Sequence, residues 1–76
     1  MDNNITNPDY YKKDREFEPV KVIKDWDLNF NLGNAVKYIS RAGRKLSALD
    51  DLIKARRYLS FEINYLEGKD MTDGDY

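Results

Sequence analysis

The 76-residue sequence contains no cysteine and no histidine. The absence of cysteine excludes disulfides, thiolate metal sites and a cysteine nucleophile, and the absence of histidine removes the commonest metal ligand and general base. A domain of this size buries only about 60% of its unfolded surface, so disulfides, metals or partner subunits often stabilise it. Self-association is the aid that remains, and we expect a homo-oligomer.

Long apolar runs and catalytic motifs are absent as well. The sequence has no run of about 18 apolar residues for a membrane span, and its first residues lack the basic-then-apolar pattern of a signal peptide. We therefore expect a cytosolic protein with no membrane partner. Neither a G-x-x-x-x-G-K-S/T phosphate loop nor a G-x-G-x-x-G or H-E-x-x-H motif is present. The sequence predicts no catalytic residue, no metal ligand and no cofactor, apart from Mg²⁺ carried by a bound nucleotide.

The charged residues are unevenly distributed, although the formal net charge is only −1. Residues 1–30 carry five Lys or Arg and seven Asp or Glu, residues 31–58 carry seven and two, and residues 59–76 carry one and five. The sums are −2, +5 and −4, so the positive charge is concentrated in the middle of the chain. Basic side chains often do no more than solvate helix faces. A cluster of them, however, also suits an anionic ligand.

Capping signals and helix breakers predict three helices. The predicted bounds are Pro19 to between Asp25 and Asp27, about Phe30 to Ala42, and from just after Ser47 to just before Gly68. Proline is favoured at the first helical position, and Gly43 can take the left-handed conformation that ends a helix. Ser47 and Asp50 have the spacing of a capping box. We expect the next residue, Asp51, to pair with a basic neighbour.

Apolar residues recur at helical spacing in the second and third predicted helices. The inward residues expected are Leu32, Ala35, Val36, Ile39 and Ala42 for the second helix, and Leu49, Leu52, Ile53, Leu59, Ile63 and Leu66 for the third. Tyr58, Phe61 and Tyr65 form a partly separate strip that completes the core or makes a subunit contact. The short link between these helices predicts an antiparallel hairpin. The expected fold class is therefore all-α, a small three-helix domain built around an antiparallel helical hairpin.

The predicted single helical domain covers residues 8–68. Residues 1–7 are polar without periodicity and are expected to form a flexible lead-in, and residues 69–76 are expected to form an acidic, flexible tail. A turn-forming Asn-Pro-Asp sequence precedes Tyr10 and Tyr11. These two tyrosines are either anchors for this arm on the helical body or a lid that stacks on a ligand.

One face of the second predicted helix carries four side chains suited to a ligand: Asn34, Lys37, Tyr38 and Arg41. Their spacings of three, four and seven positions place them in line on the helix. Guanidinium and ammonium groups bind phosphate, an amide reads a base edge or a ribose, and a phenol stacks or hydrogen-bonds. Arg44 and Lys45 extend this face beyond the helix end. The sequence therefore predicts a nucleotide-binding site, with Tyr10 and Tyr11 as its further candidates.

Two neighbouring features leave alternatives open. Basic residues of the third predicted helix can add to the site from the antiparallel partner: Lys54, Arg56 and Arg57. Gly33, within the second helix, indicates a close approach by a packed helix, by a partner or by a ligand.

These residues give the chain a resemblance to the domain of unknown function 3310 family of phage proteins, often described as nucleotide kinase-like. The resemblance is carried by Gly33-Asn34, Lys37-Tyr38, Arg41, Lys45, Asp51-Leu52, Lys54-Ala55 and Tyr58-Leu59, within a stretch from Pro8 to Glu67. The family usually has His where Tyr10 stands and often has Asp where Lys21 stands. The resemblance implies a phage origin, nucleotide-related work and a location in the cytoplasm of the infected host. The two departures favour binding over catalysis.

Three functions follow from these observations. The first is a nucleotide-binding protein that sequesters a nucleotide or cyclic nucleotide, including a host immune messenger, as an anti-defence sponge. The second is a nucleoside monophosphate kinase, in which Arg41, Lys45 and Mg²⁺ supply positioning and charge neutralisation. The third is a nucleic-acid or host-protein interaction module, and the pI of about 5.3 weighs against nucleic acid. We favour the first, and the ligand's identity and the number of subunits stay open.

Overall fold

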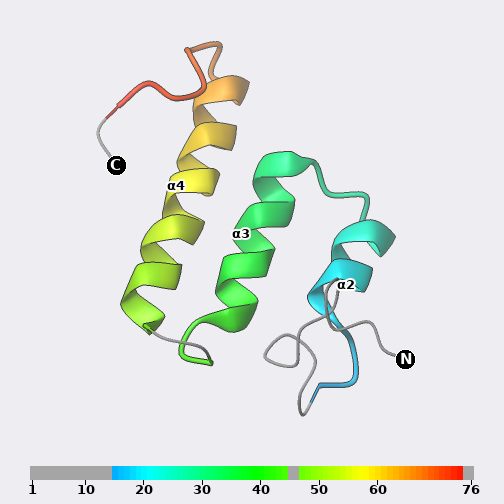
Figure 1. Ribbon diagram of the computed structural model, residues 1–76. Helices are drawn as coiled ribbons and strands as arrows, with labels where there is room; N and C mark the ends of the chain where they lie inside the picture. The colour runs from blue at the N-terminus through cyan, green and yellow to red at the C-terminus, as the bar shows by residue number, and fades with distance from the viewer. Residues whose placement is uncertain (1–14, 45–46, 75–76) are drawn as a thin grey trace.

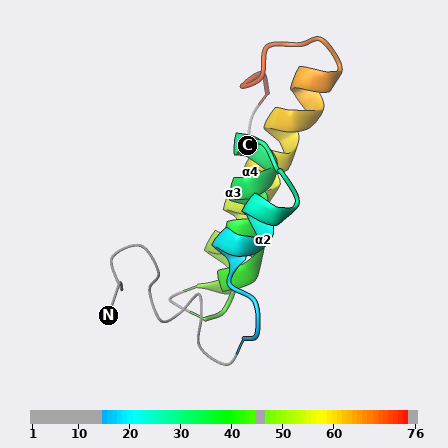
Figure 2. The same cartoon turned by 90° about the vertical axis from the view of Figure 1, so that its right-hand side faces the viewer.

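The computed structural model describes residues 15–44 and 47–74, which form three α-helices. They are α2 (Pro19–Asp25), α3 (Phe30–Arg41) and α4 (Ala48–Leu66). The helices lie side by side with α3 in the middle, and α3 and α4 run antiparallel (Figure 1). Seen from the edge they overlap, so the three form a single layer (Figure 2). The predicted all-α class and helical hairpin are confirmed, and the described part of the chain contains no strand.

The helices begin where the sequence predicts. Pro19 is the first residue of α2. Ser47 caps α4, because its Oγ accepts a hydrogen bond from the Asp50 N–H at 3.1 Å. Asn29 caps α3 in the same way, with the Leu32 N–H donating to its Oδ1 at 2.9 Å. These side chains satisfy N–H groups that have no partner inside their helices.

Glycines end the two longer helices. Gly43 follows α3 with a φ of 82° and thus confirms the predicted stop. Gly68 follows α4 with a φ of 79°. The N–H of Gly68 donates to the Tyr65 carbonyl at 3.1 Å, and the Lys69 N–H donates to the Asn64 carbonyl at 2.9 Å. These two bonds close the last carbonyls of α4 in the arrangement that a left-handed residue permits.

The end of α2 has the same two-bond closure without a glycine. The Leu28 N–H donates to the Ile23 carbonyl and the Asp27 N–H donates to the Lys24 carbonyl, both at 3.1 Å. Asp27 takes a φ of 55° to make these bonds possible. Left-handed backbone is unfavourable for an L-residue by about 1 kcal/mol, although aspartate tolerates it better than most. The turn between α2 and α3 is therefore strained at Asp27.

The interface between α3 and α4 has small side chains at its centre. Ala35 and Ala55 are the buried apolar side chains of this interface, and none of the large side chains in the described chain is fully buried. Small residues let the two helix backbones approach closely. Polar contacts then hold the hairpin at its open end, where Asn29 and Asn31 donate to the Glu62 carboxylate at 3.0 and 3.1 Å.

The apolar side predicted to face inward from α4 is exposed, and this prediction was wrong. Five of its six residues are 40–73% exposed: Leu49, Leu52, Leu59, Ile63 and Leu66, which we call the α4 stripe. The side of α4 that meets α3 instead carries Asp51 and Ala55, both buried, and Tyr58, half-buried. Helical periodicity identifies an apolar face but does not say which neighbour covers it, and here the small and aromatic residues make the contact.

The prediction for α3 holds in part. Ala35 is buried, whereas Leu32, Val36 and Ala42 are half-buried. Ile39 is exposed, although its spacing placed it in the inward set.

Gly33 allows α2 to pack against α3. A Cβ atom at this position would lie 3.0 Å from Cγ2 of Ile23, closer than side chains normally approach. The sequence left open whether a packed helix, a partner or a ligand approaches Gly33 closely. In the structure the close neighbour is the packed helix α2.

A short segment after α4 turns back alongside the helix (Figure 1). Its anchor is Asn64, a buried residue of the last turns of α4. The Asn64 amide donates to the Met71 carbonyl at 3.0 Å and to the Asp73 carbonyl at 2.8 Å. These two bonds define the path of the first residues of the acidic segment.

Candidate functional site

Three cationic side chains surround the ring of Tyr38. The Lys37 Nζ lies 5.0 Å and the Arg41 Cζ 4.9 Å from the ring centroid, and both belong to α3. The Lys54 Nζ reaches the same ring from α4 at 5.5 Å. Cations at these distances are attracted by the negative face of an aromatic ring. We call these residues, together with Tyr58 beneath them, the Tyr38 cluster.

Aromatic packing fixes the ring of Tyr38 in place. It stacks on Tyr58 of α4, with the ring centroids 6.0 Å apart and the planes 11° from parallel. Tyr58 makes edge contacts in turn with Phe30 at 5.8 Å and Phe61 at 5.6 Å. Offset stacks and edge-to-face pairs are the favoured aromatic arrangements. The platform of the cluster is therefore built across the hairpin, and a disturbance of either helix would move it.

Arg41 is tied to Asp51 across the same hairpin. The Arg41 Nε donates to the Asp51 Oδ1 at 2.9 Å, and the two side chains are only 14% and 4% exposed. This pair confirms that Asp51 has a basic partner. The sequence analysis predicts that the Arg41 guanidinium binds phosphate. In the structure this guanidinium also stabilises the hairpin, because it joins the last turn of α3 to the first turn of α4.

Lys37 and Lys54 are the members of the cluster without an acidic partner. Both are half-buried, and within residues 15–44 and 47–74 neither ammonium pairs with a carboxylate. Three cations lie around the Tyr38 ring, and Asp51 supplies a carboxylate to one of them, Arg41. An anion would complete the electrostatics of this site.

Asn34 lies beside the cluster, one turn before Tyr38. Its Nδ2 donates to the Phe30 carbonyl at 2.8 Å, so the amide nitrogen is occupied by the helix backbone. Asn34 and Lys37 line a groove of about 260 Å³ together with Ile23, Leu28, Asn29, Phe30 and Gly33. The groove brings an amide and an aromatic ring together beside Lys37, which is one of the three cations.

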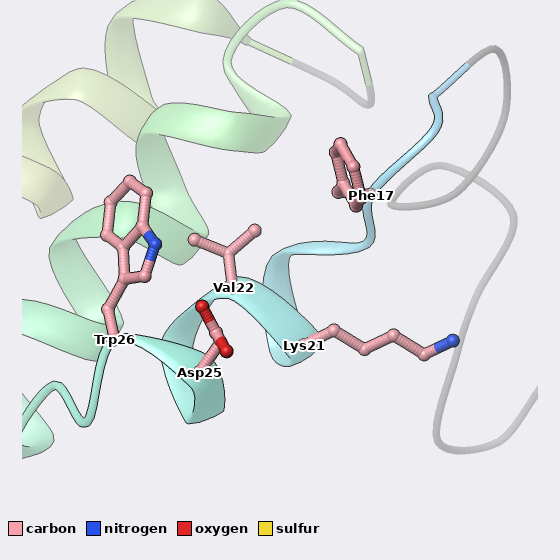
Figure 3. A pocket seen from close by; sticks show the side chains of 5 residues that line it. All are labelled: Phe17, Lys21, Val22, Asp25 and Trp26. Atoms are coloured by element: carbon pink, nitrogen blue, oxygen red, sulfur yellow. The ribbon is translucent and has the colours of Figure 1, made fainter.

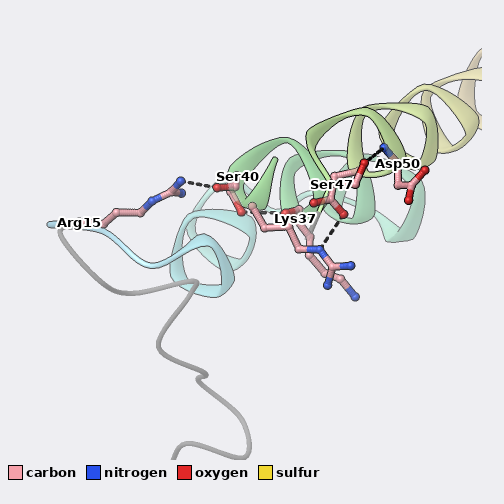
Figure 4. A network of polar contacts seen from close by, with 7 residues as sticks. Arg15, Lys37, Ser40, Ser47 and Asp50 are labelled. Carbon is pink, nitrogen blue, oxygen red and sulfur yellow. Dashed lines mark hydrogen bonds and ion pairs between the residues drawn. The ribbon is translucent and has the colours of Figure 1, made fainter. Parts of the chain in front are cut away.

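The C-terminal turn of α3 receives a further basic residue that the sequence reasoning missed. Arg15, in the segment before α2, donates from its guanidinium to the Ser40 carbonyl (Figure 4). The Ser40 hydroxyl donates to the Lys37 carbonyl at 2.7 Å. No sequence signal links Arg15 to Ser40, because the contact depends on how the segment before α2 passes α3.

The remaining predicted site residues are less closely grouped. Arg44 is exposed just beyond α3. Lys45, Tyr10 and Tyr11 lie outside the described residues. Of the basic residues considered on α4, Lys54 joins the cluster, whereas Arg56 is exposed and falls in line with the α4 stripe.

A second hollow lies on the outer helix α2. It has a volume of about 540 Å³ and is lined by Phe17, Lys21, Val22, Asp25 and Trp26 (Figure 3). The two aromatic rings stand on either side of Val22, and the ammonium of Lys21 points away from Trp26. This hollow is more apolar in character than the Tyr38 cluster, with Lys21 as the basic residue among those that line it.

Other kinds of site receive no support from the described chain. Within it, no three acidic side chains come together as a metal site would require. Nor does it contain a helix with the length and apolarity needed to span a bilayer.

The chain matches, over residues 5–60, the family described as a protein of unknown function, DUF3310. No curated protein and no solved structure matches it. The matched stretch includes α2, α3, most of α4 and every residue of the Tyr38 cluster. Because the match covers most of its length, the chain belongs to the DUF3310 family.

Proposed function

We propose that this protein binds a phosphorylated small molecule of the nucleotide class through the Tyr38 cluster. The observation that carries the proposal is the convergence of Lys37 and Lys54, from two different helices, on one aromatic ring. Neither ammonium pairs with a carboxylate of the described residues. Two half-buried ammonium groups gathered near one ring repel each other. A bound phosphate relieves this repulsion and accepts charge-assisted hydrogen bonds from both.

The groove beside the cluster supports a nucleotide rather than a bare phosphate. Phe30 is 73% exposed and offers a ring on which a base can stack. The Asn34 side chain lines the same groove and keeps its carbonyl oxygen for a donor on the base or ribose. Lys37 lies between this groove and the Tyr38 ring, so phosphate and nucleoside would occupy adjacent positions.

The biological role that we attach to this site is stoichiometric sequestration. In this proposal a phage protein acts in the cytoplasm of the infected host and holds a nucleotide or cyclic nucleotide messenger of host immunity, so that the messenger cannot signal. A homo-oligomer belongs to the proposal, because a chain of 76 residues without disulfides is often stabilised by partner subunits.

The test is a calorimetric screen of the purified protein against mononucleotides, dinucleotides and cyclic nucleotides, with each ligand recovered and identified by chromatography. Saturable binding of a ligand that is recovered intact supports the proposal. Conversion of a monophosphate other than AMP to its own diphosphate, with ATP converted to ADP, would make the protein a kinase and reject sequestration. The absence of binding across the whole panel would reject the nucleotide site itself.

A further inference from the structure

We propose that a second copy of this chain packs on the α4 stripe, with the two α4 helices antiparallel. This inference is independent of the proposed ligand, because it concerns the opposite face of the hairpin. It names the surface and the register through which the chain would assemble.

The described chain leaves many of its large apolar side chains exposed. All five residues of the α4 stripe are substantially exposed, while the buried apolar side chains between α3 and α4 are those of Ala35 and Ala55. The three helices form one layer (Figures 1 and 2). Stable domains are built from at least two packed layers around a core, and large exposed apolar patches mark interaction surfaces. A second layer is what this architecture lacks.

The apolar face is shared by both helices of the hairpin and lies opposite the Tyr38 cluster. α3 and α4 meet through Ala35 and Ala55. Tyr38 and Tyr58 each follow these alanines by three positions and stack on one side of the hairpin. Residues that follow by four positions point to the other side, and these are Ile39 and Leu59, both exposed. A partner on this side would leave the basic cluster open.

The spacing of the α4 stripe makes it complementary to itself. With Arg56 included, its members are separated by three, four, three, four and three residues. This is the apolar repeat of a helix seam, and it reads the same from either end. Two copies related by a twofold axis therefore align along their whole length, as an isologous interface requires.

The register follows from the spacing. In this antiparallel register Leu49 contacts Leu66 of the partner subunit, and Leu52 contacts Ile63 of the partner subunit. Arg56 contacts Leu59 of the partner subunit. The seam is about 26 Å long. Arg56 is the one charged side chain on it, and its aliphatic stem can cover the opposing leucine while its guanidinium reaches solvent.

A second copy fits this face better than an unrelated partner. The palindromic spacing is required only when the same helix supplies both sides of the contact. Two stacked hairpins would also form a four-helix bundle, in which the exposed α4 stripe and Ile39 become core.

The first test measures the mass of the full chain by sedimentation equilibrium over a range of concentrations. We expect a dimer or a larger assembly with an even number of chains. Ile63→Glu should weaken association by about tenfold or more. Val20→Glu, which places the same charge on an equally exposed residue of α2, should leave the mass unchanged. A monomeric or trimeric wild-type chain, or equal effects of both variants, would overturn the proposal.

The second test distinguishes the antiparallel register from a parallel one, and it does not depend on variants that weaken the interface. Since the chain has no cysteine, single cysteines can be introduced as Leu49→Cys and Leu66→Cys. Mixing the two variants under oxidising conditions should give a disulfide between them, whereas Leu49→Cys alone should not cross-link. Efficient cross-linking of Leu49→Cys to itself would indicate parallel helices and overturn the register. Arg56→Leu, which completes the apolar seam, should tighten association, and weaker association would contradict the proposal.

Discussion

Arg41, in the last turn of α3, forms an ion pair with Asp51, in the first turn of α4, beside the link between the two helices. The Arg41 Nε donates to the Asp51 Oδ1 at 2.9 Å, and both side chains are largely buried. The pair closes the hairpin at one end, while the Glu62 carboxylate closes it at the other through Asn29 and Asn31. Because Arg41 also lies against the Tyr38 ring, the stability of the hairpin and the geometry of the cluster depend on the same contact.

Asp51→Ala should lower the free energy of unfolding by about 3 kcal/mol, because it leaves a largely buried guanidinium without its carboxylate. Asp50→Ala is the matched control, since its carboxylate is exposed in the same helical turn and contributes only about 0.5 kcal/mol through the helix dipole. Urea unfolding of both variants at one protein concentration measures the difference. An equal decrease in the free energy of unfolding in the two variants would show that the buried pair contributes no more to stability than the exposed carboxylate does.

Asp27→Gly should raise the free energy of unfolding by about 1 kcal/mol, because glycine takes the left-handed φ of 55° without strain. Two residues earlier the same substitution has the opposite effect: Asp25→Gly lies within α2 and should lower the stability by up to about 1 kcal/mol. Thermal unfolding followed by circular dichroism gives both values. A destabilised Asp27→Gly would mean that the aspartate side chain contributes more than the strain removes.

Gly33→Ala should destabilise the protein by about 1 kcal/mol, because the new methyl group would lie 3.0 Å from Cγ2 of Ile23. The loss should disappear in an Ile23→Leu background, in which that methyl branch is absent, and should persist in Ile23→Val, which keeps it. Chemical unfolding of the double variants separates the two cases. If all three backgrounds respond alike, the contact between α2 and α3 is not the reason for the glycine.

Asn64→Ala should free the segment after α4, since the amide that holds the Met71 and Asp73 carbonyls is removed. Amide hydrogen exchange in residues 70–73 should speed up, and the stability should fall by about 1–2 kcal/mol. Asn34→Ala removes a comparable amide on α3 and serves as the control, because its bond to Phe30 is distant from this segment. Unchanged exchange in Asn64→Ala would contradict the assigned anchor.

The helix bounds could be predicted from the sequence because local signals set them. Pro19, Gly43 and Ser47 each act within a few residues of their own position, and the structure places each where its chemistry predicts. The left-handed Asp27 could not be foreseen, since aspartate is compatible with several conformations and the closure of α2 depends on Leu28 reaching back to Ile23.

The orientation of α4 was the part of the fold that sequence reasoning placed wrongly. Both the leucine-rich side and the aromatic side of this helix have helical spacing, and periodicity gives no reason to choose between them. The choice depends on Ala35 and Ala55, whose small size allows the close contact that turns Tyr58 toward α3 and Leu59 away from it. Likewise, the alignment of Lys37, Tyr38 and Arg41 was foreseen, but the stacking of Tyr38 on Tyr58 is a property of the paired helices.

The measurement that tests the proposed function most directly is a calorimetric titration with a nucleotide that the screen has shown to bind. This nucleotide is titrated into the wild-type protein and into a Lys37→Gln/Lys54→Gln double variant. Lys24→Gln, on the exposed last turn of α2, provides a control for the loss of a positive charge. The double variant should bind at least about a hundredfold more weakly, because two charge-assisted contacts to phosphate are lost, while Lys24→Gln should bind like the wild type. Undiminished binding by the double variant would contradict the assignment of the site to the Tyr38 cluster.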